Sequence, residues 1–226
     1  MSVQLSSSTI EVLKNFASIN SGLMFREGKR QRTISPTKTV FAEVQLEDEI
    51  PSSFGIYDLN NLLAVLTFDG GQIPAVSYQD PNLTVKIRDT EITKFRCCDE
   101  KMLVTPPNKD LDLGVSDIEF ELSEEMLSRI LKAASILSAP HIVVEGDGTV
   151  LRLTVIDVNN DSSNQYSVEV KNTDQVCRMV FRTENWKMML GDYQVSISSK
   201  GIAKFENAAR KLKYWLALEV GSKTQK

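Results

Sequence analysis

The chain has 226 residues, of which 42% are hydrophobic and 25% are charged, the balance of a folded protein with room for one large domain or two of about 100 residues. Its formal net charge of −4 excludes a protein that is basic over its whole surface, as compact nucleic-acid-binding proteins usually are. A small basic contact face on an otherwise acidic exterior stays possible.

The first predicted element is an amphipathic helix. Ser8 and Glu11 have the spacing of a capping box, which predicts a start near Ser8. Residues at 3.6-residue spacing form an apolar side (Ile10, Val12, Leu13, Phe16, Ala17) and a polar side (Glu11, Lys14, Asn15, Ser18). Asn20-Ser21-Gly22 should end the helix, with Gly22 able to take positive φ near the helix end. The pattern alone predicts an ordinary surface helix, on which Lys14 is the only cation of the polar side.

The remainder of the first half reads as short strands around one short helix. Strands are predicted at residues 22–26, 31–35 and 40–46, as a meander, and at 54–57, 73–78, 83–88 and 91–98. Asp58 is expected to cap a helix at 59–66, with Leu59, Leu62, Leu63 and Leu66 on its buried side.

Residues 99–114 show no periodicity and contain Pro106-Pro107, which predicts an interdomain connector. The connector nevertheless carries an apolar triplet, Met102-Leu103-Val104. Two explanations stay open for this triplet: it holds the connector on the protein surface, or it recruits a partner.

The second half repeats the order of the first. A strand at 118–122 precedes a helix that Ser123 caps and that ends near Leu137. Its apolar side is Met126, Leu127, Ile130, Leu131 and Ala134, and its polar side is Ser128, Arg129, Lys132 and Ser135. Strands follow at 142–145, 151–158, 166–171 and 176–182, then a short helix at 184–190 capped by Thr183, then strands at 193–198, 202–206 and 212–220.

This repetition predicts an α+β fold of two similar domains, each with two helices packed on antiparallel sheets. The expected division is an N-terminal domain at 1–98, the connector at 99–114 and a C-terminal domain at 115–226.

The residues that could carry chemistry are sparse. Cys97, Cys98 and Cys177 form no C-x-x-C pair and His141 is the only histidine, so no zinc site is expected, and no other metal or cofactor. No nucleophile elbow or phosphate-binding loop is present either. We therefore expect a non-enzymatic protein of a reducing compartment, without a signal peptide or a membrane span. An enzyme on a duplicated scaffold is the rival class, and it would need polar groups converging in a pocket.

Five segments, in this order and spacing, resemble the DNA polymerase sliding clamps of T-even-like tailed phages. The segments are LKNFASINSG (residues 13–22), IYDLN (56–60), NWKM (185–188), AKFE (203–206) and ALE (217–219). The resemblance implies the DNA clamp fold of the eukaryotic proliferating-cell clamp, with three subunits in a closed ring.

On that resemblance, the helices line the hole of the ring around duplex DNA. Lys14, Arg129, Lys132 and Lys187 would then face the phosphates. Few, spread cations suit sliding, because attraction to a uniform phosphate ladder has no preferred register, whereas base contacts would have to be broken at each step.

The resemblance also implies that edge strands of neighbouring subunits join head to tail. By position we expect residues 91–96 of one subunit to pair with residues 166–171 of the next. Lys94, Arg96, Tyr166, Val168 and Val170 are the expected interface residues.

The partners implied are double-stranded DNA, bound without sequence preference, the replicative DNA polymerase, the clamp-loader ATPase and late-transcription factors. Met102, Leu103 and Val104 are candidates for the rim of a pocket that receives partner peptides. The function implied is that of a processivity factor for DNA replication in the cytoplasm of an infected bacterial host. Support of phage late transcription is a further role that the resemblance implies. The alternative is a monomeric phage adaptor or structural protein that does not encircle DNA.

Overall fold

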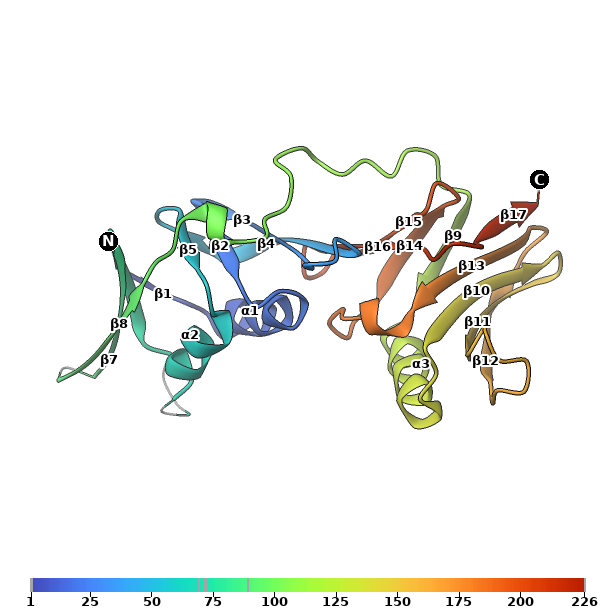
Figure 1. The fold of residues 1–226 in the computed structure, drawn as a ribbon, viewed down its shortest axis with the longest axis horizontal. Coiled ribbons are helices and arrows are strands. Elements are labelled where there is room, and N and C mark those ends of the chain that lie inside the picture. Colours follow the sequence, from blue (N-terminus) through green and yellow to red (C-terminus); the bar gives the residue numbers. More distant parts are fainter. Residues whose placement is uncertain (1, 69, 71–72, 89, 226) are drawn as a thin grey trace. The chain divides into compact units, whose positions relative to one another are not determined.

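Figure 1 shows the computed structural model of the chain, which describes residues 2–68, 70, 73–88 and 90–225. The chain divides into two units: Met1–Lys109 with Arg210–Leu212, and Asp110–Ala209 with Lys213–Lys226. In each unit at least one α-helix packs against antiparallel strands. No helix in the described part of the chain is both long enough and apolar enough to cross a membrane.

The first unit contains two α-helices and three groups of paired strands. The helices are α1 (Ser7–Ile19) and α2 (Leu59–Leu66). The strands are β1 (Ser2–Gln4), β2 (Leu23–Phe25), β3 (Gly28–Ile34), β4 (Val40–Ile50), β5 (Phe54–Ile56), β6 (Ala75–Gln79), β7 (Asn82–Arg88) and β8 (Glu91–Arg96). One sheet has the order β1-β6-β7-β8, β3 forms a hairpin with β4, and β2 pairs with β5.

The predicted meander of the first three strands is therefore wrong in part. β3 and β4 are neighbours, but β2 lies beside β5, with Leu23 opposite Ile56 and Phe25 opposite Phe54. The Phe25 and Phe54 rings stack at a centroid distance of 4.7 Å. Both rings are buried, so tertiary packing overrides the neighbour-to-neighbour pairing that the sequence suggested.

Helix α1 begins at Ser7, slightly earlier than the predicted start near Ser8. Ser6, not Ser8, is the N-cap: its backbone is extended and its Oγ accepts a hydrogen bond from the Thr9 N–H at 3.2 Å. The Ser6 N–H and Oγ both donate to Asp48 Oδ2, at 2.6 and 2.8 Å. The carboxylate of β4 thus holds the start of α1 in place.

Gly22, after α1, was expected to be able to take positive φ, and it is not among the glycines that have one. A close approach explains the glycine instead. A Cβ at Gly22 would lie 2.7 Å from Leu103 Cδ2, too close for any larger residue unless Leu103 moved. Asn20 ends the helix by donating its N–H to the Phe16 carbonyl at 2.8 Å.

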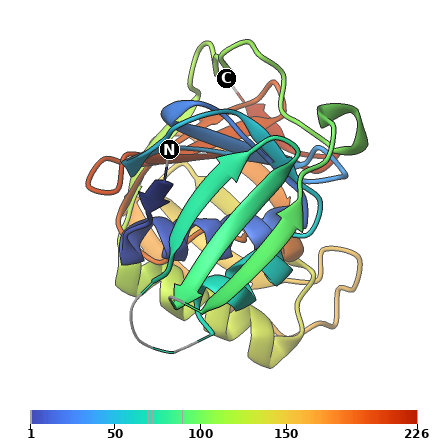
Figure 2. The ribbon, with the colours of Figure 1, turned by 90° about the vertical axis from the view of Figure 1, so that its left-hand side faces the viewer.

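Helix α2 matches its prediction. Asp58 accepts the Asn61 N–H at 3.1 Å, and Leu59, Leu62, Leu63 and Leu66 are buried. α2 contacts α1 and β7. Figure 2 shows the sheet of the first unit from its outer side, with the two helices behind it.

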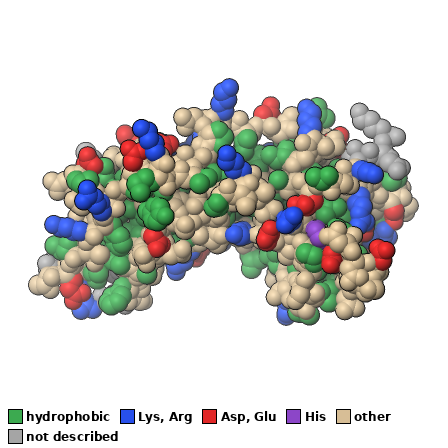
Figure 3. Space-filling model, viewed as in Figure 1, with side chains coloured by type: hydrophobic (Ala, Val, Ile, Leu, Met, Phe, Trp, Pro, Cys, Tyr) green, Lys and Arg blue, Asp and Glu red, His purple; other side chains and the backbone are tan. Residues whose placement is uncertain are grey.

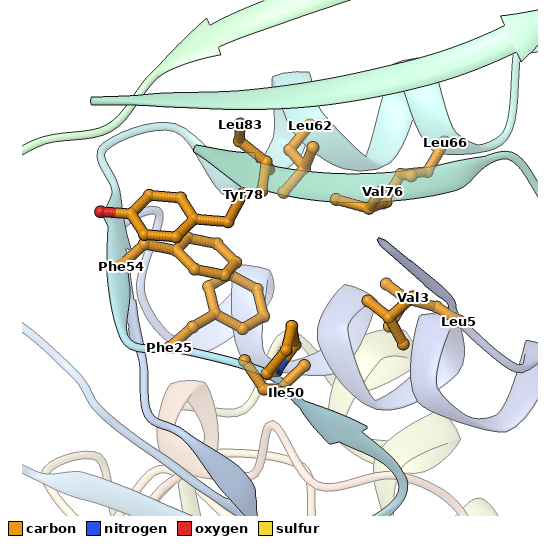
Figure 4. A pocket seen from close by; sticks show the side chains of 11 residues that line it. Val3, Leu5, Phe25, Ile50, Phe54, Leu62, Leu66, Val76, Tyr78 and Leu83 are labelled. Carbon is orange, nitrogen blue, oxygen red and sulfur yellow. The ribbon is translucent and has the colours of Figure 1, made fainter. Parts of the chain in front are cut away.

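A small apolar cavity lies in the core of the first unit, between the four-stranded sheet, α2 and the end of β4. Figure 4 shows the stacked rings of Phe25, Phe54 and Tyr78 at one end of the cavity. Its described lining is hydrophobic apart from the Tyr78 hydroxyl. Such a lining offers no acid, base or nucleophile for catalysis at neutral pH.

The second unit has one α-helix and two larger sheets. The helix is α3 (Glu124–Leu137). The strands are β9 (Ile118–Leu122), β10 (His141–Asp147), β11 (Val150–Ile156), β12 (Tyr166–Asn172), β13 (Val176–Arg182), β14 (Tyr193–Ser198), β15 (Ile202–Asn207), β16 (Leu212–Ala217) and β17 (Lys223–Gln225). One sheet has the order β12-β11-β10-β13-β17, and the other contains β16-β15-β14-β9.

Helix α3 matches its prediction in position and cap. Ser123 Oγ accepts the Met126 N–H at 3.2 Å, and Glu124 and Glu125 occupy the first turn, where the helix dipole favours them. Leu127, Ile130 and Ala134 are buried. α3 contacts β11 of the five-stranded sheet.

The prediction of a second short helix at 184–190 is wrong. Only a 3-10 turn forms, η2 (Thr183–Asn185), and the residue before it, Arg182, makes no side-chain capping hydrogen bond. Thr183 Oγ1 donates instead to the Ala139 carbonyl at 2.8 Å. Trp186 and Met188 are buried with Lys187 exposed between them, and residues 186–189 form no regular secondary structure. The second unit therefore has one α-helix and a 3-10 turn where two helices were predicted.

Candidate functional site

Helix α1 presents its polar side to solvent. Lys14 and Glu11 are both exposed and lie three residues apart, so they are neighbours on the helix surface. Glu11 Oε2 lies 3.4 Å from the guanidinium of Arg210, which belongs to the same unit. Arg210 therefore adds a cation beside Glu11 on the polar side of α1 that the sequence analysis missed. The basic run Arg210-Lys211-Leu212-Lys213 could have drawn attention to it.

Helix α3 presents Arg129 and Lys132 on its exposed side, three residues apart. Arg129 pairs with Glu125 at 2.6 Å, one turn earlier on the same helix. Both partners are largely exposed, so water screens the pair and the guanidinium keeps its positive field towards solvent. The polar side of α3 is thus mixed in charge, not uniformly basic.

The four predicted DNA-facing cations do not form one cluster within either unit. Arg129 and Lys132 lie together on α3, whereas Lys187 belongs to the irregular segment after η2 and Lys14 to the first unit. Figure 3 shows basic and acidic side chains interspersed over the face that it draws.

The two strands predicted to join subunits both lie at sheet edges. β8 is the outermost strand of β1-β6-β7-β8, and β12 is the outermost strand of the five-stranded sheet. Lys94 and Arg96 are exposed on β8, and Tyr166, Val168 and Val170 are half-buried on β12. Each strand therefore has an open side, which pairing with another strand requires.

Of the apolar triplet of the connector, only the middle residue packs against the first unit. Leu103 packs against Gly22 and Gly55, where an added Cβ would lie 2.7 and 3.1 Å from its methyl groups. Met102 and Val104 are exposed by 62% and 41%. Leu103 thus holds the connector down, while its two neighbours face solvent.

Polar contacts fix the same part of the connector on the first unit. Asn20 donates its side-chain amide to the carbonyls of Ile34 and Val104, at 2.9 and 3.0 Å. Arg32 donates to the Pro107 carbonyl at 2.6 Å, and Arg26 pairs with Glu100. The exposed side chains of Met102 and Val104 are therefore presented from a backbone that is held in place.

In the part of the chain that the structure describes, no group of three or more His, Cys, Asp or Glu residues could hold a metal ion. Burial raises the pKa of the Cys97 thiol to about 11, with Cys98 and Asp80 adding to the shift. Burial also raises the pKa of Cys98 and of Cys177. These cysteines are poor nucleophiles at neutral pH.

Two family descriptions match the chain, one in each half. "DNA polymerase processivity factor" matches residues 6–104, and "gp45 sliding clamp, C terminal" matches residues 119–220. The sliding clamp of Vibrio phage KVP40 is 30% identical over 96% of this chain and 99% of its own length. The sliding clamp of Enterobacteria phage T4 is 29% identical over 97% of this chain and 98% of its own.

Solved structures share the fold. PCNA of A. fulgidus, solved with the C-terminal region of FEN-1, superposes with a TM-score of 0.68 at 15% identity, covering 98% of this chain and 99% of that one. The DNA polymerase III β subunit of Pseudomonas aeruginosa gives a TM-score of 0.67 at 13% identity, covering 98% of this chain and 64% of that one. The predicted DNA clamp fold is thereby confirmed. From the matches over both halves, the chain belongs to the sliding clamp family of DNA polymerase processivity factors.

Proposed function

We propose that this chain is the subunit of a homotrimeric ring that encircles duplex DNA and tethers the replicative DNA polymerase to it. The observation that carries the proposal is that each unit has a sheet with an open edge, β8 in the first and β12 in the second. Two different edges on one chain suit a head-to-tail contact, which closes into a ring when its rotation divides a full turn. We assign Lys94, Arg96, Tyr166, Val168 and Val170 to this contact.

DNA would be held by confinement, with weak charge attraction inside the ring. We assign Lys14, Arg129, Lys132 and Lys187 to the DNA-facing surface, and their exposure supports this role. Each cation that neutralises a phosphate makes binding depend on salt, with a slope of about −0.9 per contact. A ring with a few such contacts should slide freely and remain on circular DNA.

The exposed Met102 and Val104, with Leu103 holding the segment, are proposed as part of the rim where partner peptides dock. The partners proposed are the polymerase, the clamp-loader ATPase and, in phage late transcription, transcription factors. The proposed place of action is the cytoplasm of the infected bacterial host, and the protein is proposed to have no catalytic activity of its own. We propose the division into a domain at 1–98, a connector at 99–114 and a domain at 115–226.

The first test is mass in solution followed by a processivity assay. We expect a species of three times 25.3 kDa by analytical ultracentrifugation, and longer products from polymerase on primed circular DNA when clamp and loader are present. A monomer that leaves product length unchanged would point to the adaptor or structural alternative.

The DNA-facing assignment has its own test, which is replacement of Lys14, Arg129, Lys132 and Lys187 together by Ala. We expect the trimer to persist while loading and processivity fall, most clearly at moderate salt, because the phosphate attraction is lost. The matched control replaces four other exposed lysines, Lys29, Lys109, Lys200 and Lys223, which removes the same charge. Equal losses in both variants would show that net charge matters and that these positions do not.

A further inference from the structure

A row of alternating charges crosses the outer face of the five-stranded sheet. Glu169 of β12, Arg152 of β11, Glu145 of β10 and Arg178 of β13 are directly opposite one another in register. Arg152 lies 3.3 Å from Glu169, and Arg178 lies 2.8 Å from Glu145. We call these four residues the charge row. Cross-strand pairs of opposite charge stabilise neighbouring strands, so the row favours one register within the sheet.

The charge row ends at the open edge with an anion. Glu169 is 68% exposed, with the cation Arg152 on the inner side and the sheet edge on the other. A strand that extended the sheet here would place a side chain directly opposite Glu169. The alternation of the row favours a cation at that position.

The backbone of β12 is ready to pair at the same place. Thr149 accepts the Thr173 N–H, so the odd-numbered residues of β11 direct their backbone groups towards β12. After the bulge opposite Leu151 and Arg152, these odd residues face Val168 and Tyr166. Glu169 and Ser167 therefore direct their N–H and C=O groups towards the open edge.

The backbone of β8 has the complementary arrangement. The Cys97 N–H donates to the Pro81 carbonyl at 2.9 Å, in register with the β7–β8 pairing. Because such bonds alternate along an antiparallel pair, Lys94 and Arg96 direct their backbone groups away from β7. Both side chains are exposed on the outer face, whereas Phe95 between them is half-buried.

We propose that β8 of one copy adds antiparallel to β12 of a neighbouring copy with Lys94 opposite Glu169. This inference rests on the proposed ring and specifies its register. Lys94 continues the charge row across the contact, Arg96 meets Ser167, and Phe95 meets Val168 on the inner face. Lys94 and Arg96 then pair with Glu169 and Ser167, whose backbone groups also point outward, which satisfies four backbone groups in each strand.

Other registers lose one of these features. Moving the strands by two residues places Arg96 opposite Glu169, but Ser167 then meets Cys98, whose N–H already donates to the Gly55 carbonyl at 2.9 Å. Moving them the other way places Glu169 opposite Ile92, which is apolar. A one-residue shift brings Lys94 against a valine of the inner face. A parallel strand with Lys94 at Glu169 would bring Arg96 opposite Lys171, a like-charged pair.

A charge swap tests the register. Lys94→Glu and Glu169→Lys each place like charges opposite one another, and each should raise the dissociation constant of the trimer about tenfold at low salt. The double variant Lys94→Glu with Glu169→Lys restores an opposite pair and should return to within about threefold of wild type. Sedimentation velocity over a protein dilution series, with circular dichroism as a check of folding, gives these values.

The matched control is Arg96→Glu with Glu169→Lys. This control introduces the same charges on the same two strands, but the reversed charge on β8 lies at position 96 and not at 94. Like the Lys94 swap, it contains Glu169→Lys, so both double variants lose the Arg152–Glu169 pair within the chain. Failure of this control to recover, beside recovery of the Lys94 swap, supports the register. Recovery of the control alone overturns the register and leaves the ring intact. Single variants that assemble as wild type overturn the choice of edges, and a monomeric wild type overturns ring and register together.

Discussion

The two units differ in structure at corresponding positions of the repeated element order, where the first has α2 and the second has η2. In the first unit Asp58 caps α2 and four leucines at helical spacing bury one side of it. In the second unit the corresponding stretch is a 3-10 turn followed by Trp186 and Met188, buried two residues apart. The difference shows that a cap residue alone does not make a helix. The spacing of the large buried side chains also matters: four leucines recur at helical spacing in α2, whereas Trp186 and Met188 lie only two residues apart.

The outer faces of the two edge-bearing sheets also differ. In the first unit Thr84 lies opposite Lys94 and Asn82 opposite Arg96, so these two cations of the edge strand have no opposite charge directly across on β7. In the second unit the charges alternate across four strands and end in Glu169. Two edges of like charge would repel one another. The cations of β8 and the anion Glu169 of β12 are instead of opposite charge.

The largest expected effect is on the aromatic anchor of the second unit. Trp186 is 4% exposed and meets the rings of Phe181 and Phe205 edge to face, at 5.7 and 5.4 Å. Trp186→Ala should lower the free energy of unfolding of this unit by about 3–5 kcal/mol, because it leaves a large cavity. Trp215 lies in the same unit, so its fluorescence during urea denaturation measures the change. Lys187→Ala is the control, expected within about 0.5 kcal/mol of wild type.

A smaller effect is expected where a carboxylate anchors each long helix. Asp48 accepts two hydrogen bonds from Ser6 before α1, whereas Asp192 accepts one, from the Glu124 N–H at 2.8 Å, at the start of α3. Asp48→Asn should cost about 1–2 kcal/mol, and Asp192→Asn about half of that, measured by thermal unfolding monitored by circular dichroism. Equal costs would mean that the two helix starts are held alike.

The Asp48 anchor should also depend on pH. Burial would raise the pKa of Asp48, but hydrogen bonds from the Ser6 N–H and from the Thr9 and Ser6 hydroxyls, with the charge of Lys29, outweigh it and lower the pKa. A lowered folded-state pKa contributes stability that is complete above the unfolded value of about 3.9 and is lost as pH falls through the folded value. The stability difference between wild type and Asp48→Asn should therefore shrink below about pH 4. A difference that stayed constant down to pH 2 would assign the effect to packing.

The two short segments should respond differently to loss of their first polar side chain. Asp58→Ala removes a helix cap and should cost about 1 kcal/mol with a loss of ellipticity at 222 nm. Thr183→Ala removes a hydrogen bond to the Ala139 carbonyl and should cost a similar free energy without changing the helical signal before unfolding. A loss of helical signal in the Thr183 variant would contradict the 3-10 assignment.

The smallest effect is expected from cysteine alkylation. With its pKa at about 11, Cys97 should react with iodoacetamide at pH 7.5 about a hundredfold more slowly than an ordinary thiol, because little thiolate is present. Cys177 of the second unit is buried, and its burial raises the pKa of its thiol, so it should also react slowly. Peptide mass spectrometry on the intact and the urea-unfolded protein compares the rates, and fast labelling of the intact protein would contradict the assigned burial.

Much of the fold could be read from local pattern. α2 and α3 were predicted with their caps and bounds, since apolar spacing and a capping side chain lie within one short segment. The start of α1 was misplaced because its cap depends on Asp48, about forty residues away. The pairing of β2 with β5 was missed for the same reason, because aromatic stacking between distant residues selects it.

For the candidate site, the sequence by itself determined which cations lie on the polar sides of the helices and, through ordered segment resemblance, which family the chain belongs to. Only the tertiary structure decided that Arg210 lies against Glu11 of α1, and that Leu103 packs on Gly22 and Gly55 while Met102 and Val104 stay exposed. It also decided that β8 and β12 are sheet edges. The physical reason is the separation along the chain over which each interaction acts. Periodicity and capping act within a few residues, whereas sheet edges, charge rows and close backbone approaches exist only after distant segments have packed together.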